Sequence, residues 1–310
     1  MIQFVKHQDL DRNKWDHVVT TSPYPSVFAT SELLDILTDN SEWNALVDDD
    51  YSAVMPLPCR KKWGVCYVYT PFFASQLGIF SIKPVTAEKV LDFFRAIPPK
   101  YRHVDLFLNA HNPSNLIVDS VFTYVSHQID LKASYDNLYK SFSQNTKRNI
   151  KASEKHFLTI EKNEKLVCEI IELFRNNRGK SEAVHYRDRD YEVLVRASEA
   201  LLSHNCLDVW GVRNQSGKLI AGALIVLDGK KRLFWFSGRD ECATDSKPMF
   251  FLLNEYLKQN AEQDLIFDFN GSLNENVARM YKGLGGTPYP IPMIKLTKGL
   301  LLKCVHRLRH

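Results

Sequence analysis

Hydrophobic and polar residues follow two periods along this chain, one of about two residues and one of about 3.6, which predict strands and helices respectively. Proline, glycine and asparagine punctuate the segments and mark many of the predicted ends. The first half is expected to contain, in order, a strand at residues 2–5, helices at 11–19 and 31–37, strands at 45–57 and 65–70 joined as a hairpin, a helix at 85–97, and strands at 103–109 and 123–131.

The second half repeats this alternation and includes a meander of three strands. The pair Asp228-Gly229 separates two of these strands and is typical of a tight hairpin turn. The order of helices and strands predicts a mixed α/β architecture. The expected elements are a long helix at residues 135–156, a strand at 158–161, helices at 166–176 and 191–202, strands at 207–213, 219–227 and 232–237, a helix at 249–259, a strand at 265–269, a short helix after it, and a strand at 291–296.

Residues 264–289 contain the most informative local signal. An apolar strand at 265–269 leads through Gly271 into a helix, and Ser272 and Glu275 have the spacing of a capping box. The helix is amphipathic and ends in glycine, which favours a left-handed C-cap. Its apolar face contains Val277, Met280, Tyr281 and Leu284, and its C-cap candidates are Gly285 and Gly286.

This helix resembles the N-E-x-A-x-x-L-Y-x-K-x-G-F helix of GNAT-type N-acyltransferases. Residues 141–162 and the sequence FDFNGS at 267–272 resemble more specifically the two-domain, Fem-type branch of that superfamily. That branch includes aminoacyl and peptidyl transferases of cell-wall assembly. Val277 and Gly286 replace the alanine and phenylalanine of the motif. The residues that carry the helix resemblance are Asn274, Glu275, Tyr281, Lys282, Leu284 and Gly285.

The resemblance implies an α/β (α+β) fold of two tandem GNAT-like acyltransferase domains, each with a mixed central sheet flanked by helices. With 310 residues and 45% hydrophobic content, the chain is long enough for two domains that each bury a core. We expect an N-terminal domain at residues 1–131 and a C-terminal domain at 132–310. The transferase centre is expected in the C-terminal domain.

The net charge and the spacing of the cysteines disfavour several classes of protein. A net charge of +4 and a pI near 8.6 suit anionic ligands but are weaker than the bias of a dedicated nucleic-acid binder. The six cysteines are scattered without metal-type spacing, which predicts reduced thiols, no disulfide framework and no metal. The first residues lack a signal-peptide apolar region, and no apolar run is long enough to span a bilayer. We therefore expect a soluble cytoplasmic protein.

Two residues near the glycine turn are the catalytic candidates. Acyl transfer to an amine requires a deprotonated nucleophile, a stabilised oxyanion and a proton for the leaving group. The resemblance implies that Tyr281 supplies this proton, although an aromatic residue on an apolar helix face is equally typical of a core. Asp268 is the best candidate base, since strand alternation turns it away from the apolar face. Alternatively, Asp268 is a strand-end carboxylate that accepts hydrogen bonds from backbone amides.

The acyl donor is expected beside the strand at residues 233–237 and Gly238, where glycine would allow close approach of a ligand. GNAT enzymes that use coenzyme A usually have a glycine-rich loop before the next helix, whereas this chain has Asp245, Ser246, Lys247 and Pro248. Acetyl-coenzyme A or another acyl-coenzyme A and, alternatively, an aminoacyl-tRNA are therefore the candidate donors. The resemblance assigns donor binding to Phe236, Ser237, Gly238 and Asn274, and Lys247 is expected to compensate in part for the missing loop.

Basic clusters are the candidates for binding an anionic acceptor or a tRNA. Helical spacing places Lys147 and Lys151 on one stripe with Arg148 alongside, which suits phosphates, although such a run is often a solvated helix face. The second cluster contributes Arg178, His185 and Arg187. The tail from residue 297 resembles a basic interfacial helix, which predicts contact with the inner membrane face or, alternatively, packing against the second domain. No obligate protein partner is predicted.

The chain has no serine-hydrolase elbow, P-loop, zincin or dinucleotide-binding motif. His103, His111 and His127 lack a metal-like pattern, and we expect satisfied structural histidines. The function predicted is transfer of an acyl or aminoacyl group to an amine, such as that of a cell-wall or polysaccharide precursor. The alternative is a non-catalytic module that binds a nucleotide-sugar, a lipid-linked glycan or RNA.

Overall fold

A computed structural model describes residues 1–39, 43–115, 121–182, 184–271 and 275–297. The chain divides into two compact units, Met1–Tyr124 with Pro290–His310, and Val125–Tyr289. The boundaries lie within two strands, β7 (Val121–Asp130) and β13 (Thr287–Thr297), so each strand contributes to both units. The domains expected at residues 1–131 and 132–310 stay a prediction. The compact units differ from them by grouping the residues after Tyr289 with the first unit.

The first unit contains a mixed sheet with the strand order β1, β2, β3, β4, β6 and the end of β13. β4 and β6 run parallel, whereas the pairings among β1 to β4 are antiparallel. Large fully buried side chains, including Trp15, Trp43 and Phe93, fill its core. Its remaining elements are β1 (Ile2–Val5), η1 (His7–Asp9), α1 (Arg12–Thr21), η2 (Val27–Ala29), α2 (Ser31–Leu37), β2 (Trp43–Asp48), β3 (Ala53–Lys62), β4 (Val65–Tyr69), β5 (Phe80–Ser81), α3 (Ala87–Ala96) and β6 (Tyr101–Phe107).

Local chemistry explains the start of α1 and the turn between β2 and β3. The Asp11 side chain caps α1 by accepting a hydrogen bond from the Lys14 backbone N–H at 3.1 Å. The strand expected at residues 45–57 is wrong, because it is two antiparallel strands, β2 and β3. Asp49 and Asp50 adopt positive φ values of 35° and 42° and turn the chain between them.

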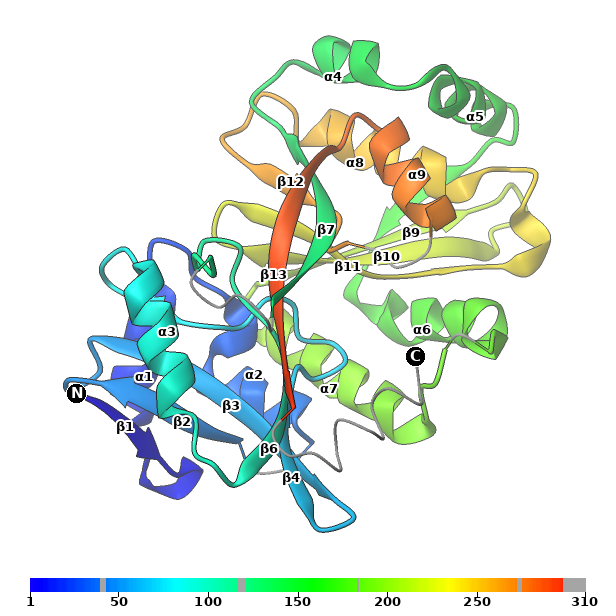
Figure 1. The fold of residues 1–310 in the computed structure, drawn as a ribbon. Helices are drawn as coiled ribbons and strands as arrows, with labels where there is room; N and C mark the ends of the chain where they lie inside the picture. Colours follow the sequence, from blue (N-terminus) through cyan, green and yellow to red (C-terminus); the bar gives the residue numbers. More distant parts are fainter. Residues whose placement is uncertain (40–42, 116–120, 183, 272–274, 298–310) are drawn as a thin grey trace. The chain divides into compact units, whose positions relative to one another are not determined.

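The second unit contains a mixed sheet with the order β7, β12, β11, β10, β9 and β8, in which β11 and β12 run parallel. Helices α6 and α7 cover one face of this sheet, and α5, α8 and α9 cover the other (Figure 1). The elements are α4 (Tyr135–Ser141), α5 (Gln144–Glu154), β8 (Thr159–Lys162), η3 (Glu164–Leu166), α6 (Val167–Asn176), η4 (Arg178–Lys180), α7 (Asp188–Ser203), β9 (Leu207–Arg213), β10 (Leu219–Asp228), β11 (Lys231–Arg239), η5 (Glu241–Ala243), α8 (Pro248–Gln259), β12 (Ile266–Asp268) and α9 (Glu275–Gly283).

These elements confirm the mixed α/β architecture and the predicted meander, which is β9, β10 and β11. The long helix expected at residues 135–156 is wrong. It is divided into α4 and α5, because Ser143 has extended backbone angles and caps α5 by accepting a hydrogen bond from the Thr146 N–H at 3.2 Å. Ser272, half of the expected capping box, lies outside the described residues.

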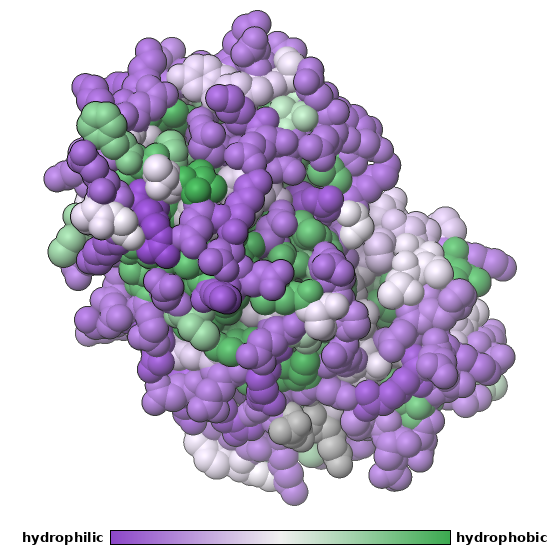
Figure 2. Space-filling view, turned by 180° about the vertical axis from the view of Figure 1, so that it is seen from behind, coloured by the Kyte–Doolittle hydropathy of each residue, from purple (hydrophilic) through white to green (hydrophobic). Residues whose placement is uncertain are grey.

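Hydrophilic side chains predominate on the face of the molecule shown in Figure 2. Within the described ranges, none of the helices combines the length and the apolar character that crossing a bilayer requires.

Two glycines allow α6 to pack directly on the sheet of the second unit. A Cβ atom on Gly238 would lie 2.2 Å from the carbonyl oxygen of Ile170 and 2.8 Å from the backbone nitrogen of Phe174. A Cβ atom on Gly222 would lie 2.4 Å from Cγ1 of Ile170. Glycine at position 238 therefore admits a helix backbone, a role that the sequence did not predict.

Gly238→Ala is expected to lower the free energy of unfolding by about 1–3 kcal/mol, because backbone atoms of α6 cannot rotate away from the added methyl group. Equilibrium unfolding in urea measures this change. Ser237→Ala, at the neighbouring strand position, is the control and should stay within about 0.5 kcal/mol of the parent protein. Equal stability of Gly238→Ala and the parent protein would contradict the packing argument.

Candidate functional site

Strands β11 and β12 separate in the second unit after a short parallel pairing. The paired residues are Lys231 with Ile266, Arg232 with Phe267, and Leu233 with Asp268. The next backbone N–H, that of Phe269, donates to the carbonyl oxygen of His127 in β7 at 3.0 Å. β12 therefore follows β7, while β11 continues beside β10 as far as Arg239. The edge of β11 beyond Leu233 faces the opening between the two strands.

A β-bulge lies in β11 at this opening. Leu224 of β10 is opposite Phe236 and Ile225 is opposite Phe234, so that Trp235 is an extra residue in β11. A bulge bends its strand and redirects neighbouring backbone groups, and bulges are frequent beside active sites.

A pocket of about 580 Å³ occupies this region of the second unit. It has an apolar interior and three cationic side chains, and none of its lining residues within the described part of the chain is a carboxylate. This composition favours a ligand with an apolar arm and an anionic group. The lining residues are Phe174, Asn177, Arg178, Phe234, Ser237, Gly238, Arg239, Thr244, Lys247, Pro248, Met249, Phe250, Val277, Met280 and Tyr281.

Arg239 and Lys247 lie at the two ends of the loop between β11 and α8. The Arg239 guanidinium donates a hydrogen bond to Oγ1 of Thr244 at 2.9 Å. The backbone carbonyl oxygen of Arg239 accepts a hydrogen bond from the Asn177 side chain at 3.0 Å. Lys247 adopts a left-handed conformation with φ of 51° immediately before Pro248, the first residue of α8. The loop therefore has a defined geometry that presents both cations at the pocket.

The start of α8 differs from a glycine-rich phosphate loop. Pro248 has no N–H, and the N–H groups of Phe250 and Phe251 donate to the Lys247 carbonyl oxygen at 3.0 and 3.2 Å. The helix start thus has few backbone donors to offer a pyrophosphate. Cationic side chains in the pocket, Lys247 among them, are the groups available in their place.

Tyr281 is both a packed aromatic residue of the core and a residue that lines the pocket, which are the two interpretations that the sequence allowed. Its side chain is only 5% exposed and stacks on Phe269, with ring centroids 4.2 Å apart and planes inclined by 20°. It also packs edge-on against Phe234, at 6.3 Å, and lines the pocket. Gly285 ends this helical segment with φ of 82°, which confirms a glycine at the C-terminal turn.

His127 is a residue near Tyr281 whose role the sequence did not indicate. It is 8% exposed, and its ring centroid lies 6.5 Å from that of Tyr281. Its Nδ1 atom is buried without a hydrogen-bond partner among the described residues, so the expectation of a satisfied histidine is wrong here. Burial and the neighbouring Lys282 charge lower the pKa of His127. The imidazole is therefore neutral at neutral pH.

Asp268 is fully buried and does not line the pocket. Its carboxylate accepts hydrogen bonds from the Asn270 backbone N–H at 2.9 Å, from Oγ of Ser126 at 3.1 Å, and from the Tyr289 hydroxyl. These contacts favour the alternative interpretation, in which the carboxylate organises the backbone after β12. A general-base role for Asp268 stays a prediction that this environment does not favour.

The other predicted residues lie in different places. Ser237, Gly238, Lys247, Arg178 and Tyr281 come together in the pocket. Four groups of described candidates do not line it: Phe236, whose ring centroid lies 4.7 Å from that of Phe174; Lys147, Arg148 and Lys151 on α5; His185; and Arg187 before α7. Asn274 and the basic tail lie outside the described residues.

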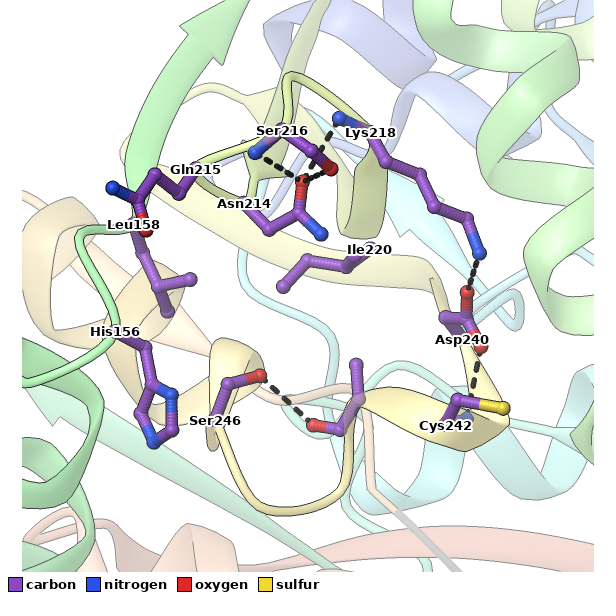
Figure 3. A pocket seen from close by; sticks show the side chains of 11 residues that line it. His156, Leu158, Asn214, Gln215, Ser216, Lys218, Ile220, Asp240, Cys242 and Ser246 are labelled. Atoms are coloured by element: carbon purple, nitrogen blue, oxygen red, sulfur yellow. Dashed lines mark hydrogen bonds and ion pairs between the residues drawn. The ribbon is translucent and has the colours of Figure 1, made fainter.

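A second pocket, of about 560 Å³, lies on the other side of the loop that joins β11 to α8 (Figure 3). Its polar groups mainly bond to one another. Lys218 donates to Asp240 at 2.5 Å, and Oδ1 of Asn214 accepts from Ser216 and from the Lys218 backbone. No group of three or more metal-binding side chains is found in the described part of the chain.

Comparison with known proteins agrees with this geometry. Residues 140–283 match the family described as acetyltransferase (GNAT) domain, which spans the pocket and most of the second unit. A search of curated proteins gives no match.

Three solved structures are similar over nearly the whole chain. FemX has a TM-score of 0.66 at 13% identity, over 91% of this chain and 96% of its own. L-PGS from Bacillus licheniformis has a TM-score of 0.58 at 11% identity, over 96% of each chain. The C-terminal domain of a putative lysylphosphatidylglycerol synthetase from Agrobacterium fabrum has a TM-score of 0.56 at 12% identity, over 93% of this chain and 92% of its own. These likenesses confirm a Fem-type, GNAT-like fold.

Proposed function

We propose that the protein is an N-acyltransferase or N-aminoacyltransferase whose donor binds in the pocket between β11, α8 and α9. The observation that supports this most directly is the convergence of Tyr281, the bulged edge of β11 and two loop cations on one apolar pocket. The family match over residues 140–283 supports the same coarse activity. Within this proposal, the similarity to the FemX and lysylphosphatidylglycerol synthetase structures favours an aminoacyl group as the group that is transferred.

The reaction joins an acceptor amine to the acyl carbon of the donor. The amine nitrogen attacks the carbonyl carbon, the carbonyl oxygen becomes an oxyanion, and the bond to the leaving sulfur or oxygen then breaks. In this proposal, backbone N–H groups on the β11 edge beyond Leu233 stabilise the oxyanion. Tyr281 gives its proton to the leaving group, and the amine loses a proton to solvent or to a neighbouring base. The acceptor is proposed to be an amine of a cell-wall or polysaccharide precursor.

The identity of the carrier depends on how its phosphates are bound. Arg178, Arg239 and Lys247 supply positive charge where a glycine-rich loop would supply backbone donors. Coenzyme A and the end of an aminoacyl-tRNA both combine a reactive acyl group with phosphates, so both suit this pocket. A non-catalytic module that binds a nucleotide-sugar, lipid-linked glycan or RNA is the second candidate, because the start of α8 lacks the usual phosphate-binding backbone.

The parent protein is expected to bind desulfo-coenzyme A saturably in calorimetric titration, with a dissociation constant on the order of micromolar. Lys247→Gly should weaken this binding about tenfold, because a charge-assisted contact is lost. The free energy of unfolding should stay within about 1 kcal/mol, because glycine adopts the left-handed conformation without strain. Lys247→Arg, which keeps the charge, is the control. No detectable heat with the parent protein would direct the search to aminoacyl-tRNA.

Tyr281→Phe should reduce turnover about 100-fold or more, because a general acid contributes at this level. Donor affinity and the unfolding transition should be preserved, since the phenyl ring keeps the stacking on Phe269. Thiol or tRNA release in the presence of amine acceptors measures turnover. Tyr186→Phe removes the hydroxyl of a tyrosine that is not part of the pocket lining and is the matched control. Unchanged turnover in Tyr281→Phe would remove this residue from the mechanism.

The basic face of α5 gives a separate test for a tRNA-linked carrier. Lys151 and Arg148 are exposed, and Nζ of Lys147 donates to the Lys140 carbonyl oxygen at 3.0 Å. Changing Lys147, Arg148 and Lys151 to Gln should weaken tRNA binding and make its dependence on salt less steep by about 2–3 in the log–log slope.

Filter binding across a salt series measures this slope. A triple change to Gln at Lys162, Lys165 and Lys258, exposed lysines of the same unit, is the control for total charge. An identical slope in the α5 variant and the parent protein would show that α5 does not bind tRNA and that its basic residues form a solvated helix face.

A further inference from the structure

The hairpin between β3 and β4 extends beyond the sheet of the first unit. Among the described residues, β3 pairs with β2 only as far as Pro58, and β4 pairs with β6 only from Cys66 onward. Between these limits, Lys61 pairs with Cys66 and Lys62 with Val65. Figure 1 shows this turn projecting at the lower edge of the view. The tip of the hairpin is therefore available to a partner.

The tip consists of Trp63 and Gly64, which have φ values of 50° and 79°. A two-residue hairpin turn with positive φ at both positions favours Asn-Gly, Asp-Gly or Gly-Gly. A bulky residue in this conformation is unusual and strained. Trp63 is 80% exposed, and its ring contacts the adjacent Lys62 ammonium, 4.8 Å from the ring centroid. Neither turn geometry nor core packing explains a tryptophan at this position.

Basic residues flank the tip on the hairpin and at the start of β6, and these two segments contain no carboxylate. Residues 53–69 and 97–104 contain no Asp or Glu. Lys61 and Lys62 are exposed on the hairpin, and Lys100 and Arg102 are exposed at the start of β6, beside Cys66 of β4. Arg60 is held over the Tyr69 ring at 4.5 Å. The exposed indole is therefore part of a hairpin rich in positive charge.

We propose that this hairpin is a docking element for an anionic lipid bilayer, with Trp63 inserted at the level of the lipid headgroups. Tryptophan is enriched at membrane interfaces because its ring combines an apolar body with an N–H donor. Lysines next to it can extend toward anionic headgroups while their apolar stems stay near the interface. A single ring on a narrow turn suits insertion better than it suits stacking along a nucleic acid, which uses several successive aromatic platforms. The proposal is independent of the transferase activity.

The five tryptophans give this proposal a direct optical test. Trp15, Trp43, Trp210 and Trp235 are at most 9% exposed, so a quencher that acts from the lipid reports mainly on Trp63. The full chain is mixed with vesicles of brominated phosphatidylcholine, with or without phosphatidylglycerol. Quenching and a blue shift of the emission that require phosphatidylglycerol are the expected results. Absence of both would overturn the proposal.

Variants separate docking from folding. Trp63→Asn removes the indole and supplies the sequence that the turn prefers, so stability should be kept or improved while sedimentation with anionic vesicles weakens about tenfold or more. Changing Lys61 and Lys62 to Gln should weaken it about fivefold for each residue, since each contributes on the order of 1 kcal/mol near an anionic surface. Ile82→Ser with Lys83→Gln, which removes an exposed apolar and a basic side chain elsewhere in this unit, is the matched control and should bind normally.

Unchanged vesicle binding by Trp63→Asn would overturn the proposal, because it would assign any membrane contact to another part of the chain. Quenching of Trp63 by single-stranded RNA, together with no response to anionic vesicles, would overturn it in favour of a nucleic-acid surface.

Discussion

The separation of β11 from β12 is the constraint on which the candidate site depends. The two strands share only three residue pairs, and the chain after β12 is then held by β7 through the hydrogen bond from Phe269 to His127. Asp268 strengthens this arrangement, because its buried carboxylate binds Ser126, the Asn270 N–H and Tyr289 at the same point. A parallel strand that stayed paired with β11 would fill the opening with backbone. The pocket therefore exists because β12 is short and is anchored on its other side.

Electrostatics decide what this opening can hold. In a glycine-rich loop, backbone N–H groups bind the phosphates without side-chain entropy, whereas here proline and the Lys247 carbonyl remove most of these donors at the start of α8. Arginine and lysine bind phosphates over a wider range of positions, because their side chains are long and flexible. The site is thus expected to bind carriers of different shapes. Discrimination between donors would then depend on the apolar interior around Phe234 and Met280.

The sequence predicted the individual helices and strands of this site better than it predicted which of them come together around the pocket. The strand, the helix after it and the glycine at its end followed from short-range patterns. Tyr281, Ser237 and Lys247 line one pocket, and their roles there stay a prediction. The division of residues 135–156 depended on Ser143 acting as a cap, which helical periodicity alone does not distinguish from an ordinary serine within a helix. The contribution of Phe174 and Asn177 arises from packing of α6 on the sheet, and spacing along the chain contains no information about it.

The two faces of β11 connect the packing of this unit to the walls of its pocket. On one face, Gly238 contacts the backbone of α6. This helix contributes Phe174 to the pocket, and Asn177 directly after it also lines the pocket. On the other, Phe234 packs edge-on against Tyr281, which in turn stacks on Phe269 after β12. A shift of α6 would therefore move one wall of the pocket, and a shift of the aromatic cluster would move the proposed acid. Because both contacts are close-packed, the sheet fixes the relative positions of these groups before any ligand binds.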